Sequence, residues 1–193
     1  MNAASLVTSI RIGLSPLFFA IFTITVRNGE ASSGAIVALW LLFAVMELSD
    51  FADGQVARRT GSVTPLGKVL DPFADSFARL TYFLTYVVAG LMPGWAFLIV
   101  LYRDLGVSFI RLMAMSKGIA MAAQVSGKIK AGVYAVAGGA GLALVSARSL
   151  LPGSPAAGIL GWVMAASWWA CAAVAAWSMV DYWAAYRRMA AGK

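Results

Sequence analysis

The stretch of residues 50–75, DFADGQVARRTGSVTPLGKVLDPFAD, places four aspartates within 26 residues, between two long apolar segments of the chain. These aspartates are Asp50, Asp53, Asp71 and Asp75. A carboxylate at membrane depth costs on the order of 2.5–3.5 kcal/mol even on the lenient insertion scale. Four such costs in one stretch indicate a functional site, and the alternative is that each aspartate pairs with a nearby arginine for helix packing.

The composition around this stretch is that of a membrane protein. Of the 193 residues, 61% are hydrophobic and only 12% are charged. Ordinary soluble domains carry about 45–50% apolar and about 25% charged residues. We therefore expect an integral membrane protein, with residues 1–193 forming a single domain.

A helix that spans a membrane needs roughly 20 mostly apolar residues. Six segments of the chain are apolar and close to this length or longer. They are residues 10–27, 33–49, 69–91, 94–115, 131–151 and 158–184. Residues 1–9 are too polar to span and are expected to form a short interfacial helix, capped by Asn2 or Ser5. The predicted fold class is an all-α membrane protein with six transmembrane helices and this short N-terminal interfacial helix.

The basic residues predict the orientation. The side that holds both termini carries nine Lys or Arg residues in its loops and ends, against two on the opposite side, so it is expected to face the cytoplasm. The nine are Arg58, Arg59, Lys68, Lys117, Lys128, Lys130, Arg187, Arg188 and Lys193; the two are Arg27 and Arg148. Turn signals on the opposite side predict short loops at Asn28-Gly29, Pro93-Gly94 and Pro152-Gly153.

The charge balance narrows the chemistry. The net charge of +7 suits anionic lipid headgroups or phosphorylated substrates. Nucleic-acid binding is the weaker interpretation, because no Lys or Arg run exceeds two residues. The chain has no histidine, which excludes histidine metal sites and Ser-His or Cys-His pairs, and its single cysteine, Cys171, is expected to serve packing.

The spacing of the aspartates favours a metal site. Asp50 and Asp53 are three residues apart and Asp71 and Asp75 four apart, so each pair shares one helical face. A short link joins the two helices, and the faces can oppose each other at the cytoplasmic end. Oxygen ligands of this kind suit Mg²⁺ or Mn²⁺, and two such ions about 3.5–4 Å apart are the usual device for displacement at phosphorus.

The full motif resembles a known family. Asp50-Phe-Ala-Asp53-Gly54-Gln-Val-Ala57-Arg58, followed by Gly67, Asp71 and Asp75, contains every fixed position of the CDP-alcohol phosphotransferase signature. The chain length and the six-helix layout are also similar to this family. The resemblance implies the family's six-helix fold, usually homodimeric, in the bacterial inner membrane, with a cavity that faces the cytoplasm and opens sideways to lipid.

The resemblance also implies a reaction and a site. Family members cleave the diphosphate of a CDP-linked lipid such as CDP-diacylglycerol, pass the phosphatidyl group to an alcohol and release CMP. The four aspartates would bind two divalent cations, and Asp75 would also take the acceptor's hydroxyl proton. The residues that would surround the CDP moiety are Gly54, Ala57, Arg58 and Gly67, with polar contacts from Thr64, Ser5 and Thr8. Small-residue helix packing is the alternative role of Gly54, Ala57 and Gly67.

A second basic group predicts the acceptor. Arg103 and Arg111 are eight residues apart on one face of the fourth helix, and Lys128 and Lys130 follow where the fifth helix begins. Together they could hold an acceptor that carries its own phosphate. The alternative is that Arg103 pairs with Asp104 or Asp71 and that the lysines are ordinary positive-inside anchors.

Three details resemble the phosphatidylglycerophosphate synthases within the family, which implies glycerol 3-phosphate as acceptor. They are the N-terminal Asn2…Thr8-Ser-Ile-Arg11 with Pro16, the Pro72 after the third aspartate, and the two motifs Arg103–Arg111 and Gly127–Lys130. Asp104 and Ala131 depart from the pattern, where Glu and Thr are usual. Inositol phosphate and phosphatidylglycerol, the latter as in cardiolipin synthases, are alternative acceptors. A cation channel or transporter lined by the aspartates and a catalytically silent scaffold are remote alternatives.

Overall fold

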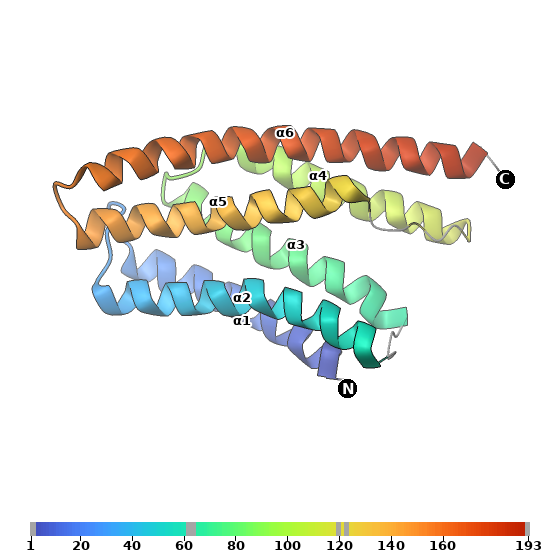
Figure 1. Ribbon diagram of the computed structural model, residues 1–193, viewed down its shortest axis with the longest axis horizontal. Helices are drawn as coiled ribbons and strands as arrows, with labels where there is room; N and C mark the ends of the chain where they lie inside the picture. Colours follow the sequence, from blue (N-terminus) through green and yellow to red (C-terminus); the bar gives the residue numbers. More distant parts are fainter. Residues whose placement is uncertain (1–2, 61–64, 119–120, 122–123, 192–193) are drawn as a thin grey trace.

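The computed structural model is all-helical (Figure 1). It describes residues 3–60, 65–118, 121 and 124–191, with side chains described outside 3–9, 50–60 and 65–72. The described helices are α1 (Ala3–Thr25), α2 (Ser33–Thr60), α3 (Pro65–Val88), α4 (Gly94–Ser116), α5 (Val125–Leu150) and α6 (Pro155–Ala191). Both ends of the chain lie toward the same end of the bundle, as expected for six helices joined by short connections (Figure 1).

The first two helices differ from their expected bounds. The separate interfacial helix expected over residues 1–9 is wrong, because α1 runs without a break from Ala3 through the first apolar segment. Its only proline, Pro16, does not end the helix. Apolar length also underestimates α2, which continues past residue 49 through the polar motif to Thr60. Polar residues such as Arg and Gln have good helix propensity, so a polar motif can continue a helix that begins in an apolar segment.

Among the described residues, the last two helices are the candidate membrane spans by length and composition. α5 and α6 are each long and apolar enough to cross a bilayer, and α1 and α2 contain shorter apolar stretches. Both longer helices extend beyond the segments expected from hydropathy, since α5 starts at Val125 and α6 covers 37 residues. α5 packs along α6, α6 also packs on α4, and α1 packs on both α2 and α3.

The core is built from aromatic rings that fill space beside small residues. Tyr82 and Tyr86 of α3 are fully buried against α5. A Cβ at Gly138 would lie 2.9 Å from the Tyr82 ring, and one at Gly141 would lie 2.6 Å from the Tyr86 ring. The Tyr86 hydroxyl donates to the Gly138 carbonyl at 2.7 Å. These glycines therefore set how closely α3 and α5 approach, and Cys171 is buried in the same core, as expected.

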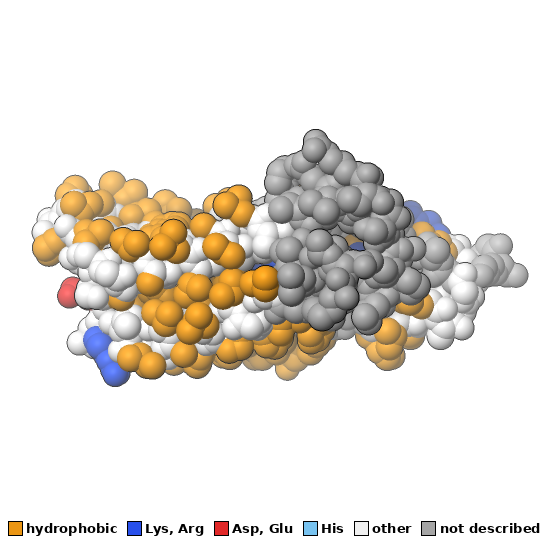
Figure 2. Space-filling view, turned by 90° about the horizontal axis from the view of Figure 1, so that it is seen from below, with side chains coloured by type: hydrophobic (Ala, Val, Ile, Leu, Met, Phe, Trp, Pro, Cys, Tyr) orange, Lys and Arg blue, Asp and Glu red, His pale blue; other side chains and the backbone are white. Residues whose placement is uncertain are grey.

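The outside of the bundle is apolar. Large side chains such as Trp162, Val136 and Trp169 are 81%, 68% and 68% exposed. Figure 2 shows hydrophobic side chains over much of the described part of one face. Exposed apolar area of this extent suits a lipid environment, because soluble monomers rarely expose large contiguous apolar patches.

The connection between α1 and α2 confirms the first turn signal. Asn28 and Gly29 have φ of 53° and 80°, and the backbone groups of Arg27 and Glu30 bond each other at 2.8 and 2.9 Å. Positive φ at both central residues is the signature of a tight reverse turn that Asn-Gly favours. This turn lies at the end of the bundle away from the chain termini (Figure 1).

Candidate active site

The backbone places the four aspartates on two consecutive helices, on either side of the connection between them. Asp50 and Asp53 belong to the C-terminal part of α2, and Asp71 and Asp75 to the N-terminal half of α3. These two parts adjoin at the end of the bundle that also holds both termini (Figure 1). The helical backbone keeps the three- and four-residue spacings that put each pair on one face.

Several predicted site residues lie outside the part of the chain whose side chains are described. Among the metal ligands these are Asp50, Asp53 and Asp71; among the CDP-lipid contacts they are Ser5, Thr8, Gly54, Ala57, Arg58, Thr64 and Gly67. Their assignments stay predictions.

Asp75 is the predicted ligand and base whose side chain is described. Its carboxylate is 25% exposed and forms an ion pair with the guanidinium of Arg11, which is only 2% exposed. Arg11 Nε also donates to Ser49 Oγ at 3.1 Å. The Arg11 side chain of α1 thus contacts both α2 and α3. For Asp75, this is the pairing with a nearby arginine that we gave as the alternative to a functional role.

A second polar contact lies on the same two helices. Glu47 of α2 and Arg79 of α3 form an ion pair, with 3.6 Å between Oε2 and NH2. The Tyr82 hydroxyl lies 3.4 Å from the other Glu47 oxygen. Because Glu47 is one turn before Asp50 and Arg79 one turn after Asp75, this pair borders the aspartate site toward the bundle centre.

The donor chemistry of the site fits a divalent cation. Asp75 presents a half-buried carboxylate at the helix ends that carry the other three aspartates. Four carboxylates form an all-oxygen set of the kind that Mg²⁺ and Mn²⁺ prefer. Among the residues with described side chains, no three acidic or cysteine groups gather closely enough to hold a metal ion.

The predicted basic group is only partly assembled. Arg103 NH1 lies 2.9 Å from Asp104 Oδ1, and Lys130 Nζ lies 3.0 Å from the same oxygen. Arg103 NH2 donates to Ser178 Oγ of α6 at 2.5 Å. Arg103 therefore pairs with Asp104, as the packing alternative predicted. Lys130, which we counted among the loop cations, is buried inside the bundle.

The other two predicted cations differ from each other. Arg111 NH2 donates to the Tyr182 hydroxyl at 2.9 Å, and the Arg103 and Arg111 guanidinium groups both lie over the Tyr182 ring. Lys128 is exposed and joins none of these contacts. The structure thus brings Arg103, Arg111 and Lys130 together around Asp104 and Tyr182, and leaves Lys128 outside.

Sequence reasoning missed the residues that hold these cations. Tyr182 and Ser178, which contact Arg111 and Arg103, both come from α6. Asp181 of the same helix accepts a 2.5 Å hydrogen bond from Ser126 of α5. The signal available in the sequence was one acidic residue near the end of an otherwise apolar helix. Arg11 gave a similar signal, because a cation inside an apolar span usually has a partner.

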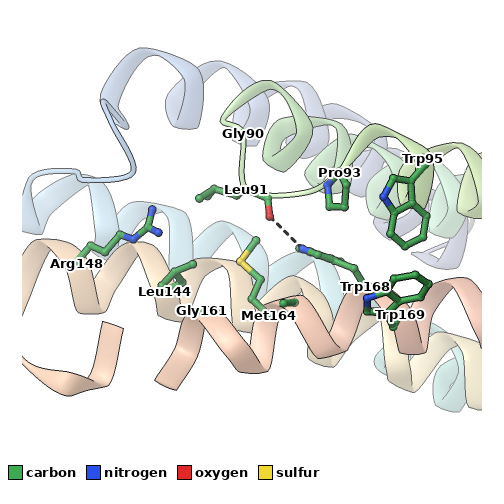
Figure 3. Close-up of a pocket in the computed structure, with 11 residues that line it drawn as sticks. Gly90, Leu91, Pro93, Trp95, Leu144, Arg148, Gly161, Met164, Trp168 and Trp169 are labelled. Atoms are coloured by element: carbon green, nitrogen blue, oxygen red, sulfur yellow. Dashed lines mark hydrogen bonds between the residues drawn. The ribbon is translucent and has the colours of Figure 1, made fainter. Parts of the chain in front are cut away.

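Figure 3 shows an aromatic pocket beside the α3–α4 connection. It has a volume of about 300 Å³ and is lined by residues of the α3–α4 connection and of α4, α5 and α6, including Trp95, Arg148 and Trp169. The Trp168 indole donates to the Leu91 carbonyl at 3.0 Å, which closes one wall. It contains none of the predicted site residues.

The six helices and their apolar outer surface are those of an all-helical membrane protein. Residues 1–177 match the family model described as CDP-alcohol phosphatidyltransferase. The chain belongs to this family, and the expectation from the aspartate motif is confirmed.

Curated relatives are similar over about 70% of the chain. A CDP-diacylglycerol–glycerol-3-phosphate 3-phosphatidyltransferase of Treponema pallidum is 36% identical over 69% of this chain and 65% of its own length. A probable phosphatidylglycerophosphate synthase of Mycobacterium tuberculosis is 34% identical over 70% and 63%. A CDP-diacylglycerol–glycerol-3-phosphate 3-phosphatidyltransferase of Bacillus subtilis is 32% identical over 67% and 70%. The match thus spans slightly less than two thirds of the first two relatives.

Proposed function

We propose that this protein transfers the phosphatidyl group of CDP-diacylglycerol to glycerol 3-phosphate, which yields phosphatidylglycerophosphate and CMP. The aspartate motif at the adjoining ends of α2 and α3, in a chain of this family, carries the proposal. The names of the relatives at 32–36% identity support the choice of acceptor.

In the proposed reaction a hydroxyl oxygen of glycerol 3-phosphate attacks the phosphorus that carries the diacylglycerol. The bond from this phosphorus to the bridging oxygen breaks, and CMP leaves with that oxygen. The hydroxyl proton passes to the Asp75 carboxylate, which must lie within about 2.6–3.2 Å of the hydroxyl to accept it. The ion pair with Arg11 restricts how that carboxylate can turn.

The four aspartates Asp50, Asp53, Asp71 and Asp75 would hold two divalent cations, Mg²⁺ or Mn²⁺. When bound, such ions neutralise charge on the diphosphate and on the leaving CMP. Contacts to the CDP moiety are assigned, as a proposal, to Ser5, Thr8, Gly54, Ala57, Arg58, Thr64 and Gly67.

The acceptor's own phosphate would bind to the cations that α4 and α5 supply. Arg103, Arg111 and Lys130 lie around Asp104 and Tyr182, and a dianionic phosphate matches their excess positive charge. Lys128 is exposed near the start of α5, where it can attract the anion from solution. We further propose that all six helices span the membrane, that the aspartates and both termini face the cytoplasm, and that the protein is a homodimer.

An acceptor panel tests the proposal. Purified protein in detergent receives CDP-diacylglycerol, Mg²⁺ and, separately, labelled glycerol 3-phosphate, inositol phosphate, serine or phosphatidylglycerol. We expect CMP release and a labelled lipid with glycerol 3-phosphate. Turnover with another acceptor alone would keep the reaction class and replace the acceptor. CMP release with none of them would overturn the proposed function.

A further inference from the structure

Two arginines of the proposed acceptor pocket share one aromatic ring. The guanidinium carbons of Arg103 and Arg111 lie 5.4 and 5.3 Å from the centre of the Tyr182 ring. Arg111 also donates to the Tyr182 hydroxyl at 2.9 Å. The backbones of the two arginines are two helical turns apart on α4, about 12 Å along the axis. Their guanidinium groups nevertheless both lie against the same side chain of α6.

The two arginines differ in how much they depend on Tyr182. Arg103 has two further partners, Asp104 at 2.9 Å and Ser178 at 2.5 Å. For Arg111, the hydrogen bond to Tyr182 is the one side-chain contact of this kind in the described part of the chain. The direction of the Arg111 guanidinium therefore rests on the Tyr182 hydroxyl.

The α4–α5 connection and the start of α5 hold Tyr182 in place. The backbone N–H of Gln124 donates to its hydroxyl oxygen at 3.3 Å. Gly127 leaves the space that the phenol needs, because a Cβ there would lie 2.9 Å from the hydroxyl oxygen. The phenol is thus held from α4, α5 and its own helix α6 together.

The arginines keep unused donors beside this ring. The Nε groups of Arg103 and Arg111 are both buried and have no hydrogen-bond partner among the described residues. A buried donor without a partner costs about 1–3 kcal/mol. Such a cost suits a site whose donors are completed by an anionic ligand.

We propose that Tyr182 is a positioning residue of the acceptor site, which sets the direction of Arg111, and to a lesser degree Arg103, toward the acceptor's phosphate. This inference rests on the proposed function. It assigns to α6, through Tyr182 and the space at Gly127, a part in acceptor affinity that the aspartate motif does not contain.

Steady-state kinetics of Tyr182→Phe, Tyr182→Leu and Gly127→Ala test the inference, with each substrate varied in turn. Tyr182→Phe keeps the ring and removes the hydroxyl, so we expect the KM for glycerol 3-phosphate to rise about tenfold. Tyr182→Leu also removes the ring and raises it further, while the KM for CDP-diacylglycerol stays within about twofold. Gly127→Ala is a change on α5 that displaces the Tyr182 hydroxyl of α6, so its effect on the KM for glycerol 3-phosphate should resemble that of Tyr182→Phe.

The chain offers matched controls. Tyr186 lies one turn further along α6, is also buried, and packs its ring under Lys117 at 5.6 Å. Gly132 lies on α5 with nothing within 4 Å of an added Cβ. Tyr186→Phe and Gly132→Ala should leave both KM values unchanged. Calorimetric titration of glycerol 3-phosphate into each variant should show weaker binding for the Tyr182 and Gly127 variants alone.

Two outcomes would overturn the inference while the proposed function stands: equal rises in both KM values, or an unchanged acceptor KM in Tyr182→Phe and Gly127→Ala. If Tyr182→Leu does not fold, the other two variants still decide. Failure of the wild-type protein to use any phosphorylated acceptor would instead remove the proposed function, and the inference with it.

Discussion

The guanidinium of Arg11 in α1 contacts the carboxylate of Asp75 in α3, across 64 positions of sequence. The same guanidinium donates to Ser49 in α2 at 3.1 Å. A single buried cation therefore joins the three N-terminal helices beside the aspartate motif. The planar guanidinium presents several donors in fixed directions and can bind two partners at once. A lysine ammonium on its flexible stem is less suited to this arrangement.

Replacing Arg11 should separate charge from geometry. Arg11→Lys keeps the charge but not the fork, and we expect kcat to fall about tenfold with little change in Tm. Arg11→Ala leaves Asp75 without this partner in a partly buried place and should also lower Tm. Arg27→Lys, an exposed position in the α1–α2 turn, is the control. Wild-type turnover in Arg11→Lys would show that the guanidinium geometry is not needed.

Asp75→Asn should remove the proton acceptor while it keeps the shape of the side chain. We expect turnover to fall by about 10²–10⁴-fold, with a folded protein of normal elution volume. CMP release is the measurement, and Glu30→Gln, an exposed carboxylate at the other end of the bundle, is the control. Near-normal activity of Asp75→Asn would exclude Asp75 as the base.

Removing divalent cations should stop turnover. After chelation and desalting, we expect no CMP release, and Mg²⁺ or Mn²⁺ should restore it because the four carboxylates form a hard, all-oxygen site. Circular dichroism of the chelated protein should retain its helical signal, which separates loss of the ion from loss of the fold. Undiminished turnover after chelation would contradict the two-metal proposal.

Asp104 should matter for stability more than an exposed carboxylate does. It is almost fully buried and lies against two cations, Arg103 and Lys130. Asp104→Asn leaves both charges buried without their anion, which costs about 3–5 kcal/mol in comparable cases. Asp104→Glu keeps the charge and should lose less. Thermal unfolding in detergent measures the Tm of both variants. Equal Tm values for Asp104→Asn and the wild type would contradict a stabilising role for the contacts of Asp104 with Arg103 and Lys130.

The spacing of α3 and α5 should be sensitive to a single methyl group. Gly141→Ala would place its Cβ 2.6 Å from the buried ring of Tyr86, so the ring or one of the two helices must shift. Overpacking of this kind costs about 1–3 kcal/mol, and we expect a lower Tm. Gly132→Ala on the same helix meets nothing within 4 Å and should not lower it. Similar Tm values for the two variants would contradict this account of the packing.

Much of the architecture could be predicted from local pattern alone. Apolar length predicted all six helices, and the Asn28-Gly29 signal predicted the first turn. The resemblance of the full aspartate motif to a known family predicted the family. The spacing of the aspartates predicted that each pair shares a helical face, which is a local property. Helix ends were less predictable: α2 continues through a polar motif, because polarity alone does not break a helix.

The partners of the buried charges could not be predicted in this way. Arg11 with Asp75, Lys130 with Asp104 and Arg103 with Ser178 are separated by 64, 26 and 75 positions. Which cation meets which anion depends on how each helix is rotated and how closely it packs, and periodicity within one helix does not specify either. The sequence by itself determined the helices and the aspartate motif. The tertiary structure decided which of the predicted cations come together. Packing of α6 brings Ser178 to Arg103 and Tyr182 to Arg111, and Lys130 of α5 reaches Asp104 of α4.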